Sequence, residues 1–115
     1  MLMDQITALS SQCDEDEREL VERMILSAAD YVRAVIHMRT IAINYAGRTG
    51  EELRTLVEQS DHDRTTFHNA LISYVDIVNR ICVSYSMPPI YTGSSIRREY
   101  GDFAYALITE IYEKR

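Results

Sequence analysis

The densest group of polar side chains in this sequence is the run from Asp61 to Asn69, where an arginine and a histidine stand one helical turn apart. Arg64 and His68 could bind an anion or exchange a proton, and Asp61 could orient either of them. The run continues without a break into an apolar helix pattern over residues 71–85. We therefore expect some of these polar groups to face the protein interior.

A helical projection separates these residues by the side on which they lie. At 100° per residue, Arg64 falls inside the apolar stripe of its helix, while Asp61 and His68 lie along one edge. Arg39 and Glu110 fall inside the stripes of the first and last long helices. We predict that these residues form a polar seam inside the bundle, in which the two arginines and His68 meet Glu110 or another carboxylate. The five members of the polar seam are Arg39, Asp61, Arg64, His68 and Glu110.

A solvated or hydrogen-bonded arrangement near a helix end is the competing interpretation of Arg64 and His68, because Arg–His pairs at this spacing commonly have that role. A second pair of the same spacing, Arg33 and His37, lies opposite the stripe of its helix. We expect that pair to face water.

The sequence gives little support to metal binding or to nucleophilic catalysis. His68 and Asp61 could supply two metal ligands, but no third ligand has a diagnostic spacing. Ser73 and Cys82 have no histidine on their own helix face to act as a base. We predict no catalytic residue, no metal ligand and no cofactor.

Composition narrows the class of protein further. The 115 residues suit a single domain spanning 1–115, and the net charge of −6 argues against binding to phosphate backbones. The sequence shows no signal peptide and no membrane span. Its two cysteines lack the spacing of a metal or redox site, so we expect free thiols and a cytoplasmic location, with a secreted protein holding one disulfide as the alternative.

The apolar periodicity predicts helices throughout. We expect a long helix over 19–46, then a helix after the capping box at Thr49 that is either short or joined to the next one, and a further helix up to Tyr85. We favour a break or kink between the last two near Ser60. Gly47 would end the first of these, and Ser60 would cap the third.

Two prolines, Pro88 and Pro89, predict a loop over 87–93, after which Ser94 or Ser95 would cap a last helix. Residues 1–13 could form a short helix or a flexible segment. The expected fold is all-α, a compact bundle of three long helices with one or two shorter ones.

The first long helix carries more apolar surface than one stripe needs. Leu26, Ile36 and Ile41 lie outside its main face, which predicts an interface with a protein partner or a homodimer. The alternative is that Ile6, Leu9 and the short helix cover this surface.

Three resemblances bear on function. Arg64 and His68 resemble the arginine and histidine of the HEPN ribonucleases, although that motif has four to six intervening residues and this chain has three. Asp61-x-x-Arg64, after an arginine-bearing helix, looks like the helical chorismate mutases, but the central lysine of that family has no counterpart here. Both resemblances cover only a few residues.

A broader resemblance covers the last half of the chain. Asp61-x-x-Arg64-x-x-x-His68-Asn69, followed by Asn79-Arg80 and Arg97-Arg98-Glu99, is similar to a family of short uncharacterised helical proteins from Gram-positive bacteria, a domain of unknown function. The resemblance implies a bacterial, cytoplasmic, all-helical protein. It supplies no activity, cofactor or site residue.

Together these observations favour a small helical module that acts through protein contacts without catalysis. The competing hypothesis is an enzyme that binds a small dicarboxylate between Arg39 and Arg64, with Glu110 orienting it and His68 nearby.

Overall fold

A computed structural model describes residues 2–44, 50–91 and 97–113, and its regular secondary structure over these ranges consists of helices, with no strand. The all-α prediction is therefore confirmed. The proposed helix stop at Gly47 and the proposed caps at Thr49, Ser94 and Ser95 lie outside the described residues. The helices are α1 (Leu2–Gln12), α2 (Glu15–Asn44), α3 (Gly50–Ser84) and α4 (Arg97–Glu113).

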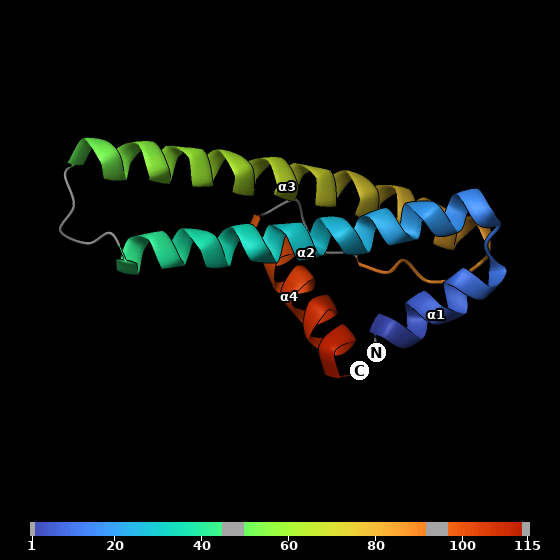
Figure 1. Ribbon diagram of the computed structural model, residues 1–115. Coiled ribbons are helices and arrows are strands. Elements are labelled where there is room, and N and C mark those ends of the chain that lie inside the picture. The colour runs from blue at the N-terminus through green and yellow to red at the C-terminus, as the bar shows by residue number, and fades with distance from the viewer. Residues whose placement is uncertain (1, 45–49, 92–96, 114–115) are drawn as a thin grey trace.

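The two long helices α2 and α3 form an antiparallel hairpin that sets the length of the molecule (Figure 1). The principal extents are 54 × 27 × 24 Å, and 35 residues of α3 account for about 52 Å at 1.5 Å per residue. Helices α1 and α4 pack against one half of this hairpin, while its other half extends beyond α4 (Figure 1). None of the described helices is long and apolar enough to cross a membrane.

A capping box begins α2. The Glu17 N–H donates to the Asp14 carboxylate at 2.8 Å, and the Asp14 N–H donates to the Glu17 carboxylate at 3.0 Å. Each acid thus satisfies a backbone donor that the first helical turn leaves without a partner. Three acidic residues in this first turn also suit the positive end of the helix dipole.

The predicted break near Ser60 is wrong, because α3 runs through it as one helix from Gly50 to Ser84. Ser60 is buried against α2 instead of capping a new helix. The polar residues around it bond within the helix: Gln59 donates to Asp63 at 3.1 Å, and the Thr66 hydroxyl donates to the His62 carbonyl at 2.9 Å. Residues 51–84 include no glycine or proline that would break the helix, and packing against α2 stabilises it over its whole length.

The end of α3 is closed by a Schellman motif. The Met87 N–H donates to the Cys82 carbonyl at 2.8 Å, and the Ser86 N–H donates to the Val83 carbonyl at 3.0 Å. Ser86 takes a positive φ of 58°, a conformation that glycine adopts more easily. The expected loop follows over its described part, and the Asn79 side chain holds it through hydrogen bonds to Ile90 and Tyr91.

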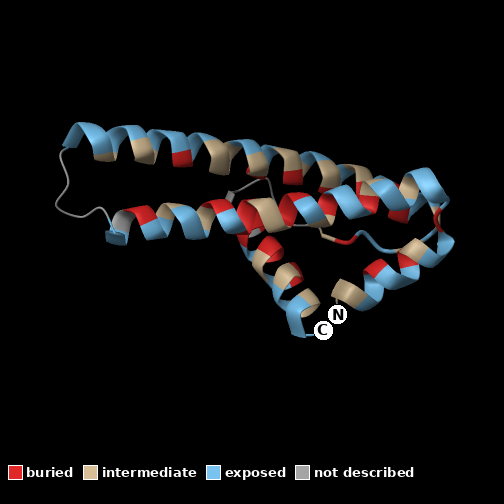
Figure 2. Ribbon diagram, in the orientation of Figure 1, coloured by how far each residue is buried: buried red, intermediate tan, exposed pale blue. Residues whose placement is uncertain are grey.

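The core lies where all four helices meet, at the α1 and α4 end of the hairpin (Figure 2). Buried residues follow the predicted stripes of α2, α3 and α4, and Ile6 and Leu9 of α1 complete the core. Helix α4 approaches α2 closely at Gly101, where an added Cβ would lie 3.1 Å from the Tyr31 hydroxyl. The largest fully buried side chains are Leu9, Met24, Leu71, Leu107, Val21, Val75, Val78 and Cys82.

Candidate functional site

The arginine of the polar seam on α3 is held by its own helix. Arg64 donates through Nη2 to the Asp61 carboxylate one turn earlier, and the Arg64 side chain is only 14% exposed while that of Asp61 is 52% exposed. This pair agrees with the predicted boundary position of Asp61. The carboxylate that Arg64 meets comes from α3 itself and not from another helix of the bundle.

His68 is a core residue, 3% exposed. Its ring lies between two tyrosines, with centroid distances of 5.5 Å to Tyr31 of α2 and 5.8 Å to Tyr100 of α4. These tilted and edge-on contacts are typical of aromatic packing. His68 therefore joins α2, α3 and α4 through its ring, and Phe103 and Tyr91 extend the same aromatic cluster.

The other two members of the polar seam lie elsewhere. Arg39 of α2 is exposed, so its predicted inward position is wrong. The Glu110 carboxylate accepts hydrogen bonds from the backbone N–H groups of Leu2 at 3.3 Å and Met3 at 3.1 Å. Glu110 thus satisfies the first turn of α1 instead of meeting Arg64. Among the five, Asp61 pairs with Arg64, while Arg39 and Glu110 lie elsewhere, so the dicarboxylate clamp between Arg39 and Arg64 gains no support from this geometry.

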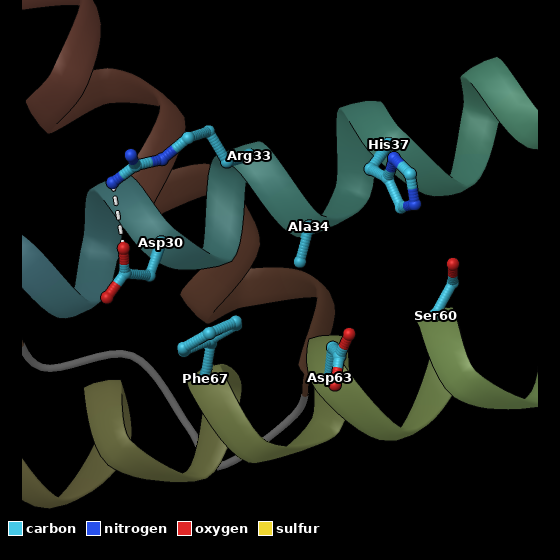
Figure 3. A pocket seen from close by; sticks show the side chains of 7 residues that line it. All are labelled: Asp30, Arg33, Ala34, His37, Ser60, Asp63 and Phe67. Carbon is cyan, nitrogen blue, oxygen red and sulfur yellow. Dashed lines mark hydrogen bonds and ion pairs between the residues drawn. The ribbon is translucent and has the colours of Figure 1, made fainter.

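A small cleft lies between α2 and α3 in the middle of the hairpin (Figure 3). It has a volume of about 270 Å³, and His37 of α2 lies across it from Ser60 and Asp63 of α3. Arg33 turns away from the cleft and pairs with Asp30 at 2.8 Å. Arg33 and His37 are both exposed, as predicted. Among the described residues, no group of three or more histidines, cysteines or acids could hold a metal ion.

An apolar groove runs along the outer face of α2 where α4 crosses it. It consists of two adjoining hollows of about 390 and 450 Å³ that share Ile25, Leu26 and Ile111. Three large apolar side chains stand out from its walls: Leu26 is 59% exposed, Ile36 51% and Tyr112 71%. The apolar groove is lined by Met3 of α1, by Ile25, Leu26, Ala29, Val32 and Ile36 of α2, and by Ile108, Ile111 and Tyr112 of α4, with Glu22 and Arg33 at its rim.

A family model described as "Protein of unknown function (DUF3232)" matches residues 1–115, the whole chain. The chain belongs to this family. Comparison with curated proteins and with solved structures gives no match. The family description assigns no ligand or reaction.

Tyr85, Cys13 and Cys82 are three further titratable residues with raised pKa values. The Tyr85 hydroxyl donates to Glu17, and this hydrogen bond raises the pKa of Tyr85 to about 12. Cys13 and Cys82 are both free thiols in the core, and burial raises the pKa of each above its usual value. The expected free thiols are therefore present, and their low thiolate fraction makes them slow to react.

Part of the apolar groove was predictable from the sequence of α2 and part was not. Leu26 and Ile36 were expected to be surplus apolar residues and are exposed, whereas Ile41 is 2% exposed and belongs to the interior. Ile6 and Leu9 are buried without covering Leu26 and Ile36. The contribution of Ile108 and Tyr112 was missed, because no periodicity shows where a later helix crosses an earlier one. The three-and-four spacing of Ile25, Ala29, Val32 and Ile36 is a signal that could have drawn attention to the outer face of α2.

Proposed function

We propose that this protein is a protein-binding module without catalytic activity and that the apolar groove is its contact surface. The observation that carries this proposal is the clustering of Leu26, Ile36 and Tyr112, each more than half exposed, around one concave apolar surface. Isolated exposed apolar residues are ordinary, but a contiguous hollow patch with a polar rim is typical of a protein contact.

The shape of the apolar groove suits a helix. Its walls are the sides of two crossing helices, and the α2 wall repeats Ile25, Ala29, Val32 and Ile36 at the spacing that receives side chains from a facing helix. An apolar helix face packed there would cover the protruding side chains. The rim carries one acid and one base, Glu22 and Arg33, which could set the direction of the bound helix. The buried thiols of Cys13 and Cys82 are consistent with action in a reducing cytoplasm.

Site-specific photocrosslinking in the native cells tests this proposal. A photoreactive phenylalanine analogue replaces Tyr112 in the groove or, as a control, Val83, which is also 64% exposed but lies on α3 away from the groove. We expect a protein adduct of one discrete mass from position 112 and none from position 83. No adduct at position 112, or equal adducts from both positions, would show that the apolar groove is not a protein contact.

A further inference from the structure

We infer that the protein bound in the apolar groove is a second copy of this chain, packed antiparallel along α2 about a two-fold axis at the height between Ser27 and Ala28. This inference rests on the proposed function and names the partner. It is carried by the distribution of charge and of side-chain size along the outer face of α2, which is complementary to itself when one copy is reversed.

The two rim charges lie on one line along the helix. Glu22 and Arg33 are eleven residues apart, which is three turns plus about 20° at 100° per residue, so both stand on the same flank of α2. Both are exposed, and both line the hollows of the groove. An antiparallel copy exchanges the two ends of this line. Each Glu22 then faces Arg33 of the other copy, and the two-fold axis creates this ion pair twice.

The same register matches large side chains with small ones. When Glu22 faces Arg33 across the axis, Leu26 faces Ala29 of the other copy, because both pairs are centred on the same point of the helix. Leu26 protrudes with 59% of its surface exposed, while Ala29 is a half-buried small residue in the wall of the hollow. A protruding leucine against an alanine allows two helices to approach closely.

The unlike charges also distinguish this arrangement from a parallel one. A parallel copy in register would bring Glu22 beside Glu22 and Arg33 beside Arg33, since equal residues then lie at equal heights. Like charges at both ends would oppose association. Arg33 already pairs with Asp30 of its own helix, but its side chain is 72% exposed and can reach a second carboxylate.

Charge reversal measured by sedimentation velocity over low to high micromolar concentration tests the inference on the purified full chain. We expect a reversible dimer for the unaltered chain. Glu22→Arg and Arg33→Glu should each weaken the dimer about tenfold, because each change turns two attractive contacts into two repulsive ones. The double variant, which restores both unlike pairs, should recover the original dissociation constant.

A matched control distinguishes the effect of reversing an interface charge from the effect of losing an exposed ion pair within one helix. Arg80→Glu on α3 also removes an exposed arginine that pairs with an aspartate of its own helix, Asp76 at 2.9 Å, but it lies outside the groove and should leave the dimer unchanged. A monomer at high micromolar concentration overturns the inference, as does a double variant that stays as weak as the single ones. In either case a crosslinked adduct at Tyr112 with a different partner would still support the proposed function, whereas the absence of any adduct would refute it.

Discussion

The polar seam and the apolar groove are the two regions of this molecule that attract functional interpretation, and they differ in whether their groups already have partners. In the polar seam, Arg64 bonds to Asp61, His68 packs between two tyrosines, and Glu110 bonds to the start of α1. In the apolar groove, Leu26, Ile36 and Tyr112 remain largely exposed. Polar residues inside a bundle here stabilise the fold, and the surface left open is the one that can bind.

The largest expected effect is on association through the apolar groove. Leu26→Asp places a charge against Ala29 of the other copy, and the two-fold axis repeats it, so the dimer should weaken about a hundredfold. Its folding stability should change little, because Leu26 is 59% exposed in the single chain. Sedimentation velocity and urea denaturation measure the two quantities. The matched variant Val83→Asp, on an equally exposed apolar residue, should leave the dimer intact.

The next largest effect concerns His68 of the polar seam and should lower the free energy of unfolding. His68→Ala leaves a cavity between Tyr31 and Tyr100, so the free energy of unfolding should fall by about 2–4 kcal/mol. His62→Ala, on an exposed residue six positions away, should change stability by no more than about 0.5 kcal/mol. Urea denaturation compares them. Equal stabilities for the two variants would mean that His68 is not the structural residue described above.

A smaller effect should follow removal of the carboxylate that holds α1. Glu110→Ala leaves the N–H groups of Leu2 and Met3 without their acceptor and should lower the free energy of unfolding by about 1 kcal/mol. Glu113→Ala, on an exposed acid of the same helix, should cost several times less. Hydrogen exchange should show faster exchange in α1 for the first variant only. Unchanged protection of α1 would contradict the capping role of Glu110.

The smallest effect is a pH dependence. The pKa of Tyr85 is about 12 in the folded chain against 10 for an ordinary tyrosine, so folding holds this proton more tightly. The stability that it contributes is present below pH 10 and is lost as the pH rises towards 12. Tyr85→Phe should therefore flatten the stability profile over this interval, as measured by urea denaturation at each pH. Tyr112→Phe, whose ring is 71% exposed, should keep the original profile.

The fold was largely predictable from sequence because the apolar stripes of α2, α3 and α4 are long and regular. The error at Ser60 arose because serine followed by acidic residues resembles a helix cap, and only contact with α2 shows that Ser60 packs as a small core residue.

The candidate site was less predictable, since a projection gives the angle of a side chain but not the partner at that angle. Arg39 falls on the predicted core stripe of α2 and is nevertheless exposed. The C-terminal part of α2 extends beyond α4 (Figure 1), and a helical projection does not show where such cover ends. Glu110 does face inward, but the element it meets is α1. The groove depends in the same way on where α4 crosses α2, and the spacing of residues within either helix does not encode this crossing.

Disulfide trapping across the two-fold axis tests the central claim most directly. Chains carrying Leu26→Cys are mixed with chains carrying Ala29→Cys under mild oxidation, while the buried Cys13 and Cys82 react slowly because their pKa values are raised. Facing positions of two packed helices meet the geometric needs of a disulfide. We predict a linked species of twice 13.3 kDa that forms faster in the mixture than in either chain alone. A mixture that links no faster than one of Leu26→Cys with Ser73→Cys, an exposed position on α3, would contradict the account.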